Sequence, residues 1–388
     1  MSYNYVVLGA GRQGTAVAYD LMRYGEAQEL VIADCDSGLA HRAADRVNSL
    51  VPSTPARAAT VNVTDQRALT ELLRGADAIV SAVPYRFNAD VATAAIASRT
   101  SMCDLGGNTD IVRKELALDK EAREALVSII PDCGLMPGMG NTLAVYAMSR
   151  IAQPHHVRIF VGGLPRHPRP PFDYLLTFHI GGLSNEYAGD AIYLRNGRIA
   201  HVPVFTELEM LDFPEPVGRC EAFVTSGGTS TCPWSFQDTL LTYEEKTVRY
   251  PGHCAAFRSF ADLGLLDLAP VEVEGTSTVP REVFHTLLEP KITFPQDDDL
   301  VALRILCNGE DEDGQQVQIK LEVIDFQDAN TGFRAMERMT GFPAAIVAYL
   351  MATGQTPRGA VPLERSVDAE AFLAEWRKRD LPLDIEVS

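Results

Sequence analysis

The stretch "VLGAGRQGTAVAYDL", residues 7–21, joins the end of a predicted strand to a predicted helix through three glycines. Gly9 allows the tight turn, Gly11 lets the backbone approach a pyrophosphate, and Gly14 lets helix and strand pack closely. The N-terminus of the helix then faces the negative charge of that group. Because the strand–glycine–helix context is complete, we predict that this loop holds a dinucleotide. A glycine turn that binds no nucleotide is the alternative.

The type of dinucleotide depends on Asp34, at the end of the second predicted strand. Its carboxylate can accept hydrogen bonds from a ribose 2′-OH and would repel a 2′-phosphate, so NAD is expected rather than NADP. Arg12 and Arg42 leave NADP open. Asp65 could lie beside the adenine or cap a helix, and the small residues 82–84 would let a nicotinamide ribose approach. The expected cofactor contacts are Gly9, Gly11, Arg12, Gln13, Gly14, Asp34, Asp65, Ala82, Val83 and Pro84.

The first third of the chain alternates short apolar runs with helical patterns. The strand candidates are residues 5–10, 29–34, 61–65, 76–84, 101–107 and 127–134, and the helical patterns cover 11–22, 37–50, 88–99 and 110–126. Apolar strands that alternate with helices are typical of a parallel, doubly wound sheet. We therefore expect an α/β fold with a Rossmann sheet in this part of the chain.

After about residue 142 the pattern changes to strands with few helices between them. Strand candidates are residues 157–165, 172–180, 220–227 and 243–252, and hairpins are predicted over 192–202 and 300–325. The first hairpin has Asn196-Gly197 as its turn, a pair that favours such turns. In the second, apolar and polar residues alternate, which indicates one buried face. This region is expected to form a central α+β domain with a mixed or antiparallel sheet.

Helical patterns return after residue 332. One helix is expected to begin at Pro343 and to end at Gly354, and another to span residues 367–379. We expect both to pack back on the first domain. The predicted domains are therefore residues 1–142 with 333–388, which bind the dinucleotide, and residues 143–332, which bind the substrate and form a dimer.

Composition argues against several classes of protein. The formal net charge of −18 over 388 residues disfavours binding to nucleic acid. No run of about 18 apolar residues predicts a membrane span, and no signal peptide is visible at the start. The seven cysteines form no CxxC pair, the eight histidines form no HExxH motif, and no metal site is expected. A cytoplasmic protein is the expectation.

Three predicted loops follow strand ends and carry groups with useful chemistry. They supply Tyr85, Asp104 and Cys133, together with Asn108 and Asp132. Because the carboxyl ends of parallel strands meet at one edge of a sheet, these side chains are expected to gather there. Asp104 is a candidate general base or a turn carboxylate, and Cys133 is a candidate catalytic group or a small buried filler.

In the second domain the densest polar stretch is "EEKTVRYPGH", residues 244–253. Arg249 can grip a carboxylate through two parallel hydrogen bonds. His253 can act as a base near neutral pH or can be a turn residue bonded to the backbone.

Two other stretches supply candidate substrate contacts. Thr229 and Thr231 offer hydroxyl groups to a second anionic group, in a loop that also offers backbone amides. His179 and Glu186 lie in "HIGGLSNEY", and Glu186 can face a substrate ammonium group.

Taken in order, several stretches resemble the saccharopine dehydrogenase-like family, and within it the L-lysine 6-dehydrogenase branch. They are "VVLGAGRQGTAVAYDL", "AVPY", "CDLGGN", "CGLMPGMGN", "GGLPRHPRPPFDYLLTFHIGGLSNEY", "EAFVTSGGTST", "KTVRYPGH" and "TGFPAAIVA". The resemblance covers nearly the whole chain, so it is far more specific than the glycine loop alone.

The resemblance implies an NAD domain built from both chain ends, a central substrate domain, and a homodimer or larger assembly. It also implies oxidative deamination of the lysine ε-amine, with release of ammonia and an aldehyde that cyclises. Tyr85 and Cys133 match residues that line the family's reaction cleft, and Arg249 matches the arginine used for a substrate carboxylate. Met136 and Phe87 depart from the pattern of saccharopine-forming relatives, which favours a smaller amine.

Several alternatives stay open. The substrate could be a secondary amine, as for saccharopine or carboxynorspermidine dehydrogenases, or the protein could bind NAD as a sensor without turnover. The sequence does not choose between Asp104 and His253 as the base.

Overall fold

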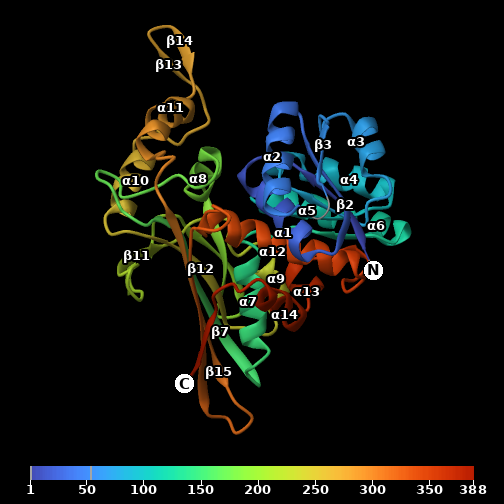
Figure 1. Ribbon diagram of the computed structural model, residues 1–388. Coiled ribbons are helices and arrows are strands. Elements are labelled where there is room, and N and C mark those ends of the chain that lie inside the picture. Colours follow the sequence, from blue (N-terminus) through green and yellow to red (C-terminus); the bar gives the residue numbers. More distant parts are fainter. Residues whose placement is uncertain (1, 53–54) are drawn as a thin grey trace.

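The computed structural model describes residues 2–52 and 55–388 and contains two large sheets (Figure 1). The N-terminal part of the chain forms most of a parallel sheet with helices around it. A long mixed sheet lies beside it, and helix α12 (Ala335–Ala352) runs between the two.

The first sheet has the order β17-β6-β5-β4-β1-β2-β3, and all of its strands are parallel. Strand β1 lies between β2 and β4, so the chain crosses over beside it, and ligands bind at such a point in doubly wound sheets. This is the expected Rossmann sheet. Its strands are β1 (Tyr3–Leu8), β2 (Ala27–Asp34), β3 (Arg57–Thr60), β4 (Ala78–Ser81), β5 (Ser101–Asp104), β6 (Ser128–Ile130) and β17 (Gly359–Ala360).

Side-chain caps fix where several helices of this domain begin. Asp36 accepts hydrogen bonds from the amides of Gly38 and Leu39, and Asn108 accepts from those of Asp110 and Ile111. Such caps satisfy amides that have no partner inside the helix. The helices are α1 (Arg12–Tyr24), α2 (Ser37–Leu50), α3 (Gln66–Leu73), α4 (Asn88–Ser98), α5 (Thr109–Leu116) and α6 (Asp119–Ala125), with a 3₁₀ turn η1 (Tyr85–Phe87).

The second sheet has the order β10-β11-β12-β7-β15-β16-β18, with β8 paired to both β12 and β9. Strands β12 and β7 are parallel and their other neighbours are antiparallel, so the sheet is mixed. Both predicted hairpins are present, and Asn196 and Gly197 have positive φ in the first. The strands are β7 (Gln153–Pro165), β8 (Asp190–Arg195), β9 (Arg198–Pro203), β10 (Glu209–Asp212), β11 (Arg219–Phe223), β12 (Thr242–Arg249), β15 (Asp299–Glu310), β16 (Gln316–Phe326) and β18 (Asp384–Val387).

Around this sheet the chain has more helix than its sequence pattern indicated. The additional elements are α7 (Met139–Met148), α8 (Ile180–Glu186), α9 (Cys232–Ser235), α10 (His253–Asp262) and α11 (Pro280–Ile292), with the hairpin β13 (Val271–Val273) and β14 (Thr276–Thr278). The hairpin projects beyond the rest of the molecule (Figure 1). The strand expected over 172–180 is wrong, because residues 172–179 lie in turns and irregular structure.

The C-terminal tail reaches both sheets. Helix α12 packs on α1, β4 and β5 and also contacts β15. It begins eight residues before Pro343, which lies inside the helix instead of starting it. Helices α13 (Leu363–Ser366) and α14 (Ala369–Lys378) follow, and β18 pairs with β16 in the second sheet. The division into residues 1–142 with 333–388 and residues 143–332 remains a proposal. The last strand of the chain, β18, belongs to the second sheet.

One large buried apolar cluster includes residues of both sheets, of α7 and of α12. Among the described residues, none of the helices is long and apolar enough to cross a membrane.

Candidate functional site

The glycine loop is closed on its inner side and open on its outer side. Gly9 has φ of +96°, and a Cβ built there would lie 2.6 Å from the backbone oxygen of Ala82. A Cβ on Gly14 would lie 1.8 Å from the backbone oxygen of Gly9, so both positions require glycine. A Cβ on Gly11, at the N-terminus of α1, has no neighbouring atom within 4 Å. The open position lies where a pyrophosphate approaches a helix N-terminus.

Asp34 ends β2 beside this loop. Its Oδ2 accepts a hydrogen bond from the Ala10 amide at 2.8 Å, and its Oδ1 accepts from the Asp36 amide at 2.9 Å. Since a carboxylate oxygen has two lone pairs, each oxygen keeps acceptor capacity for a ribose hydroxyl. The carboxylate therefore fixes the turn and stays available to a ligand.

The other predicted cofactor residues lie around the same edge. Asp65 caps α3 by accepting from the Ala68 amide at 3.0 Å, and Ala82 donates its amide to Leu8. Gln13 has a buried side-chain oxygen for which the described residues supply no donor. Val83 and Pro84 follow β4 directly. These residues fit a dinucleotide along the loop.

Arg12 is exposed beside the glycine loop, at a cavity of about 340 Å³. Arg46 and Arg334 also line this cavity, together with the acidic Asp298 and Glu337. Three arginines and two acidic residues thus line the cavity beside the loop.

Three predicted catalytic residues gather at the carboxyl edge of the first sheet. Tyr85 begins η1 after β4, Asp104 ends β5, and Cys133 follows β6. The Cys133 amide donates to the backbone oxygen of Asp104 at 2.7 Å, and the ring of Tyr85 packs against Gly107. Burial raises the pKa of the Cys133 thiol, which donates to the Ile130 backbone oxygen at 3.3 Å. The thiol is therefore protonated at neutral pH.

Asp104 and Asp132 form a buried carboxyl cluster. The Oδ1 of Asp104 accepts from the amide of Gly106 at 2.6 Å and from that of Asp132 at 3.3 Å. Burial raises the pKa of Asp104, and burial with the nearby charge of Asp104 raises the pKa of Asp132 to about 8. Both groups can therefore exchange protons at a pH where an ordinary aspartate cannot.

The alternation along β12 places Arg249, Thr247, Glu245 and Tyr243 on one face of the second sheet. Arg249 is buried and forms an ion pair with Glu186 at 3.3 Å, and its Nε donates to the hydroxyl of Tyr187 at 3.3 Å. Burial raises the pKa of Glu186 to about 7, and burial with the charge of Glu186 raises that of Glu245 to about 8. One cation thus lies among two carboxyl groups that titrate near neutral pH.

His253 begins α10 and lies behind this cluster, in a buried aromatic group. Its ring stacks on Phe257 with centroids 3.9 Å apart, and its Nε2 is 2.8 Å from the hydroxyl of Tyr187. Burial and the charge of Arg249 lower its pKa well below the usual range. The ring supports the tyrosine that holds Arg249, and it lies apart from the strand-end residues.

The remaining predicted substrate residues have partners within the chain. His179 caps α8 by accepting from the Gly181 amide at 3.0 Å. Thr229 donates to the Ile192 backbone oxygen at 2.7 Å, and Thr231 donates to Glu364 at 2.9 Å. These three residues shape the loops, and the structure does not bring them into the Arg249 cluster.

Two hydrogen bonds join the strand-end residues to the second domain. Asn185, next to Glu186 in α8, donates to the Tyr85 hydroxyl at 3.1 Å, and Ser230 donates to Asp132. The edge of the dinucleotide sheet and the Arg249 cluster therefore form one candidate site between the two sheets.

Some residues of this site were missed from the sequence. Glu245 has the same parity as Arg249 on β12, so strand alternation could have found it. Ser230 lies between the two threonines that were singled out. Buried Glu115, whose carboxyl group lies within hydrogen-bonding reach of Asp104, had no sequence signal.

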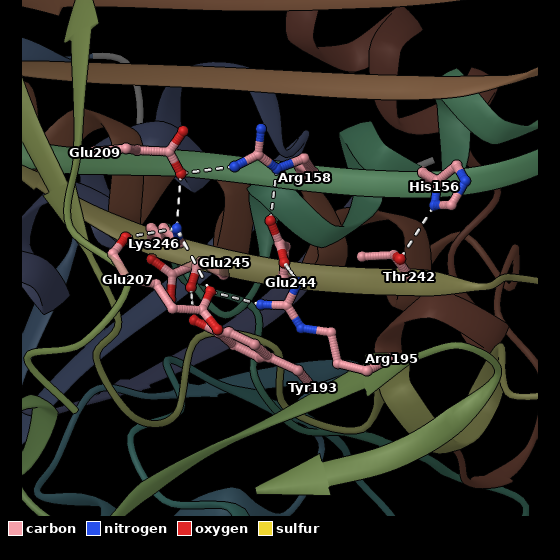
Figure 2. Close-up of polar contacts among 10 residues, drawn as sticks. All are labelled: His156, Arg158, Tyr193, Arg195, Glu207, Glu209, Thr242, Glu244, Glu245 and Lys246. Carbon is pink, nitrogen blue, oxygen red and sulfur yellow. Dashed lines mark hydrogen bonds and ion pairs between the residues drawn. The ribbon is translucent and has the colours of Figure 1, made fainter. Parts of the chain in front are cut away.

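A second cavity, of about 390 Å³, is lined by Lys246 and Glu244, which alternate along β12 with Arg249 and Glu245. Figure 2 shows the polar contacts among the side chains around it. Arg158 bonds to both Glu244 and Glu209 at 2.6 Å, and Lys246 bonds to Glu209 at 2.7 Å. Arg195 pairs with Glu244 and with Glu207. Each of these three cations already has a carboxylate partner. The charges of the network therefore balance one another without a bound ligand. Within the described chain, no group of three or more His, Cys, Asp or Glu side chains is arranged to hold a metal ion.

Comparisons with known proteins show the family to which the chain belongs. A family profile described as "Saccharopine dehydrogenase NADP binding domain" matches residues 5–130, and one described as "Saccharopine dehydrogenase C-terminal domain" matches residues 134–381. The chain resembles an apo saccharopine dehydrogenase (L-Glu forming) structure from Saccharomyces cerevisiae with a TM-score of 0.80, at 18% identity and with both chains fully covered.

Two curated relatives match this chain over only part of their own length. Mitochondrial alpha-aminoadipic semialdehyde synthase of Rattus norvegicus is 22% identical over 76% of this chain and 39% of its own. Saccharopine dehydrogenase [NADP(+), L-glutamate-forming] of Saccharomyces cerevisiae is 23% identical over 68% of this chain and 60% of its own. The chain thus spans less than two thirds of these relatives. Since the family profiles match most of its residues, the chain belongs to the saccharopine dehydrogenase family.

Proposed function

We propose that this protein oxidises the ε-amine of L-lysine with NAD⁺, releasing ammonia and a semialdehyde that cyclises to piperideine-6-carboxylate. One observation carries the proposal: two hydrogen bonds, one from Asn185 to Tyr85 and one from Ser230 to Asp132, join the carboxyl edge of the dinucleotide sheet to the second domain. In that domain lie the buried Arg249 and Glu245 and the partly buried Glu186, which pairs with Arg249. An amino acid needs a cation for its carboxylate and an anion for its ammonium group, and this cluster supplies both.

NAD is proposed as the cofactor because Asp34 would repel a 2′-phosphate. The carboxylate lies beside the glycine loop, where its oxygens keep acceptor capacity for ribose hydroxyls. The family's dinucleotide domain carries NADP in its description, and Arg12 and Arg46 offer positive charge near the loop.

In the proposed substrate pose, Arg249 holds the α-carboxylate and Glu186 takes the α-ammonium group in place of their mutual ion pair. The side chain of the substrate then extends toward Tyr85 and Asp104 at the strand ends. A bound nicotinamide supplies the hydride acceptor.

Asp104 is proposed as the base, in preference to His253. Both side chains are buried, but Asp104 ends β5 at the carboxyl edge of the dinucleotide sheet, whereas the His253 ring stacks on Phe257 in the aromatic group. The Oδ1 of Asp104 already accepts two amide hydrogen bonds, so Oδ2 is the oxygen left to take a proton from the water that attacks the imine.

The test is a screen of NAD⁺ and NADP⁺ reduction with lysine, ornithine, saccharopine and simple diamines, with ammonia measured alongside. The proposal expects NAD⁺ reduction with lysine and one ammonia released for each NADH formed. NADH binding without turnover of any amine would instead favour a sensor.

Saccharopine is the second candidate, since two of the compared proteins carry its dehydrogenase name. Arg281 is the structural feature that favours it: the guanidinium donates to Asn185 at 3.2 Å, close to Tyr85, and could hold a further carboxylate. Reduction of the cofactor by saccharopine without ammonia would establish this alternative, and Arg281→Gln should then weaken saccharopine and spare lysine.

A cytoplasmic location and a homo-oligomer, either dimer or tetramer, complete the proposal. All seven cysteines are free thiols, which suits a reducing compartment. Light scattering of the purified chain tests the assembly.

A further inference from the structure

Helix α5 directs the carboxyl group of Glu115 toward the interior of the protein. Glu115 lies in its last turn and is fully buried, three residues after the buried Val112, while Arg113 and Lys114 between them are exposed. Residues three apart share a helix face, so Glu115 occupies a position where an apolar side chain would ordinarily pack. A buried carboxyl group is costly unless it finds a partner.

The partner is another carboxyl group. Glu115 lies within hydrogen-bonding reach of Asp104, and neither Glu115 oxygen has a donor elsewhere among the described residues. Oδ2 of Asp104 also has no donor among the described residues. Its Oδ1 accepts hydrogen bonds from the amides of Gly106 and Asp132. Two ionised carboxylates can only accept hydrogen bonds, so one member of this pair must carry a proton.

We propose that Glu115 is a positioning residue that keeps this proton and donates it in a hydrogen bond to Oδ2 of Asp104, which holds Asp104 ionised and oriented at the reaction edge. The assignment of the proton follows from the donors available. Asp104 receives two amide hydrogen bonds that stabilise its charge, and Glu115 receives none. Because Asp104 is the proposed base, this inference rests on the proposed function.

The charges around the pair agree with this assignment. Burial, followed by the charge of Asp104, raises the pKa of Glu115 to about 11. Burial also raises the pKa of Asp104, and the hydrogen bond from Glu115 opposes that rise. The other titratable groups that face the pair are Asp132 and Cys133, and neither of them is a cation. With Glu115 on one lone pair, Oδ2 of Asp104 keeps its second lone pair for the proton that the reaction delivers.

The test compares Glu115→Gln, which keeps a donor, with Glu115→Leu, which removes it at similar size. Loss of a hydrogen bond to a charged group should raise the pKa of Asp104, and with it the acid limb of kcat/KM, by about one to two pH units in the leucine variant. The glutamine variant should keep the wild-type limb. Glu121→Gln, at an exposed position of α6, is the matched control. If Glu115→Leu does not fold, Glu115→Met replaces it.

Infrared spectroscopy of the full chain gives a readout that needs no turnover. Near pH 9.5, above the pKa values of about 8 of Asp132 and Glu245 but below that of Glu115, wild type should show the carbonyl stretch of a protonated carboxylic acid that both Glu115→Gln and Glu115→Leu lose. In the leucine variant the Asp104 band should appear at a higher pH than in wild type. Absence of the wild-type band, or equal acid limbs in wild type and the leucine variant, overturns the inference. A wild-type protein that shows the band and oxidises no amine overturns the proposed function instead.

Discussion

At the residue scale, Arg249 is the side chain on which the substrate proposal depends most. Its guanidinium is buried beside Glu186 and Tyr187 and is placed to bind a carboxylate. Arg249→Ala should therefore raise KM for lysine by roughly 10- to 100-fold, the equivalent of a lost charge-assisted hydrogen bond. A simple alkylamine, which has no carboxylate, should lose far less.

Steady-state kinetics with lysine and hexylamine check this prediction. Arg198→Ala, at an exposed arginine of β9, is the control and should leave both values of KM unchanged. Equal losses for the two amines would contradict the carboxylate role.

Glu245 makes stability depend on pH. Burial, then the charge of Glu186, raises its pKa to about 8, from about 4.3 in an unfolded chain. Between these values the folded state binds the extra proton, so the contribution to stability is complete at low pH and is lost as pH rises toward 8. Glu245→Gln is neutral throughout, so its stability relative to wild type should increase with pH, by at most about 1.4 kcal/mol per pH unit.

Thermal unfolding of both proteins at pH 5, 6.5 and 8 measures this effect. Glu272→Gln, on the exposed strand β13, should track wild type at each pH. A constant difference between Glu245→Gln and wild type would show that the carboxyl group does not titrate in this range.

The sequence pointed to much of the site because strand ends and strand parity are local properties. Asp104 ends one buried parallel strand and Cys133 follows the next, and such strands end at one edge. Glu115 could not be found in this way, since only the packing of α5 against that edge brings its carboxyl group to Asp104. The setting of His253 was hidden for a similar reason, because Tyr187 and Phe257 surround it from other elements.

At the scale of elements, two glycines of the glycine loop have different roles: Gly14 is needed for packing, and Gly11 is expected to matter for cofactor binding. A Cβ on Gly14 would meet the backbone oxygen of Gly9, so Gly14→Ala should force α1 from β1 and cost about 1–3 kcal/mol of stability. A Cβ on Gly11 meets no protein atom within 4 Å, so Gly11→Ala should cost only the N-cap preference for glycine over alanine, less than about 1 kcal/mol. Its methyl group would occupy the expected position of the pyrophosphate.

Chemical denaturation and NADH fluorescence titration separate the two effects. We expect Gly11→Ala to weaken NADH binding about tenfold or more, equivalent to about 1.4 kcal/mol, at nearly wild-type stability. Unchanged NADH affinity in that variant would mean that the dinucleotide does not pass over Gly11.

Elements with local signals were predicted well, and those that depend on distant contacts were not. Helix α2 begins and ends where its pattern indicated, and the structure adds that Asp36 caps its first turn. Helix α12 starts earlier than Pro343 because Asp299, in β15, accepts hydrogen bonds from the amides of Ala335 and Met336. Residues 172–180 are apolar without being a strand, since Tyr174 and Leu176 pack into the aromatic cluster around α10. An apolar run alone does not separate these outcomes.

At the scale of the whole molecule, the C-terminal tail ties the ends of the chain together. Helix α12 lies on the dinucleotide sheet, and β18 extends the second sheet near the C-terminus (Figure 1). Between them, Arg379 reaches back to Asp20 of α1 with three hydrogen-bond contacts of 2.7 to 3.0 Å, and it also pairs with Glu375 at 3.0 Å. Both members of the Arg379–Asp20 pair are fully buried at their side chains.

Removing one partner of this pair should destabilise the protein far more than replacing both. Asp20→Leu leaves the Arg379 guanidinium buried with only Glu375 as a counter-charge, which should cost about 3–5 kcal/mol of unfolding free energy. The double variant Asp20→Leu with Arg379→Met replaces the pair by apolar side chains and should recover much of that loss, because neither charge then needs a partner. Urea denaturation measures all three proteins, and Arg377→Met, at an exposed position of α14, should match wild type. If the double variant were as unstable as Asp20→Leu, the pair would hold the tail through a specific geometry that apolar packing does not replace.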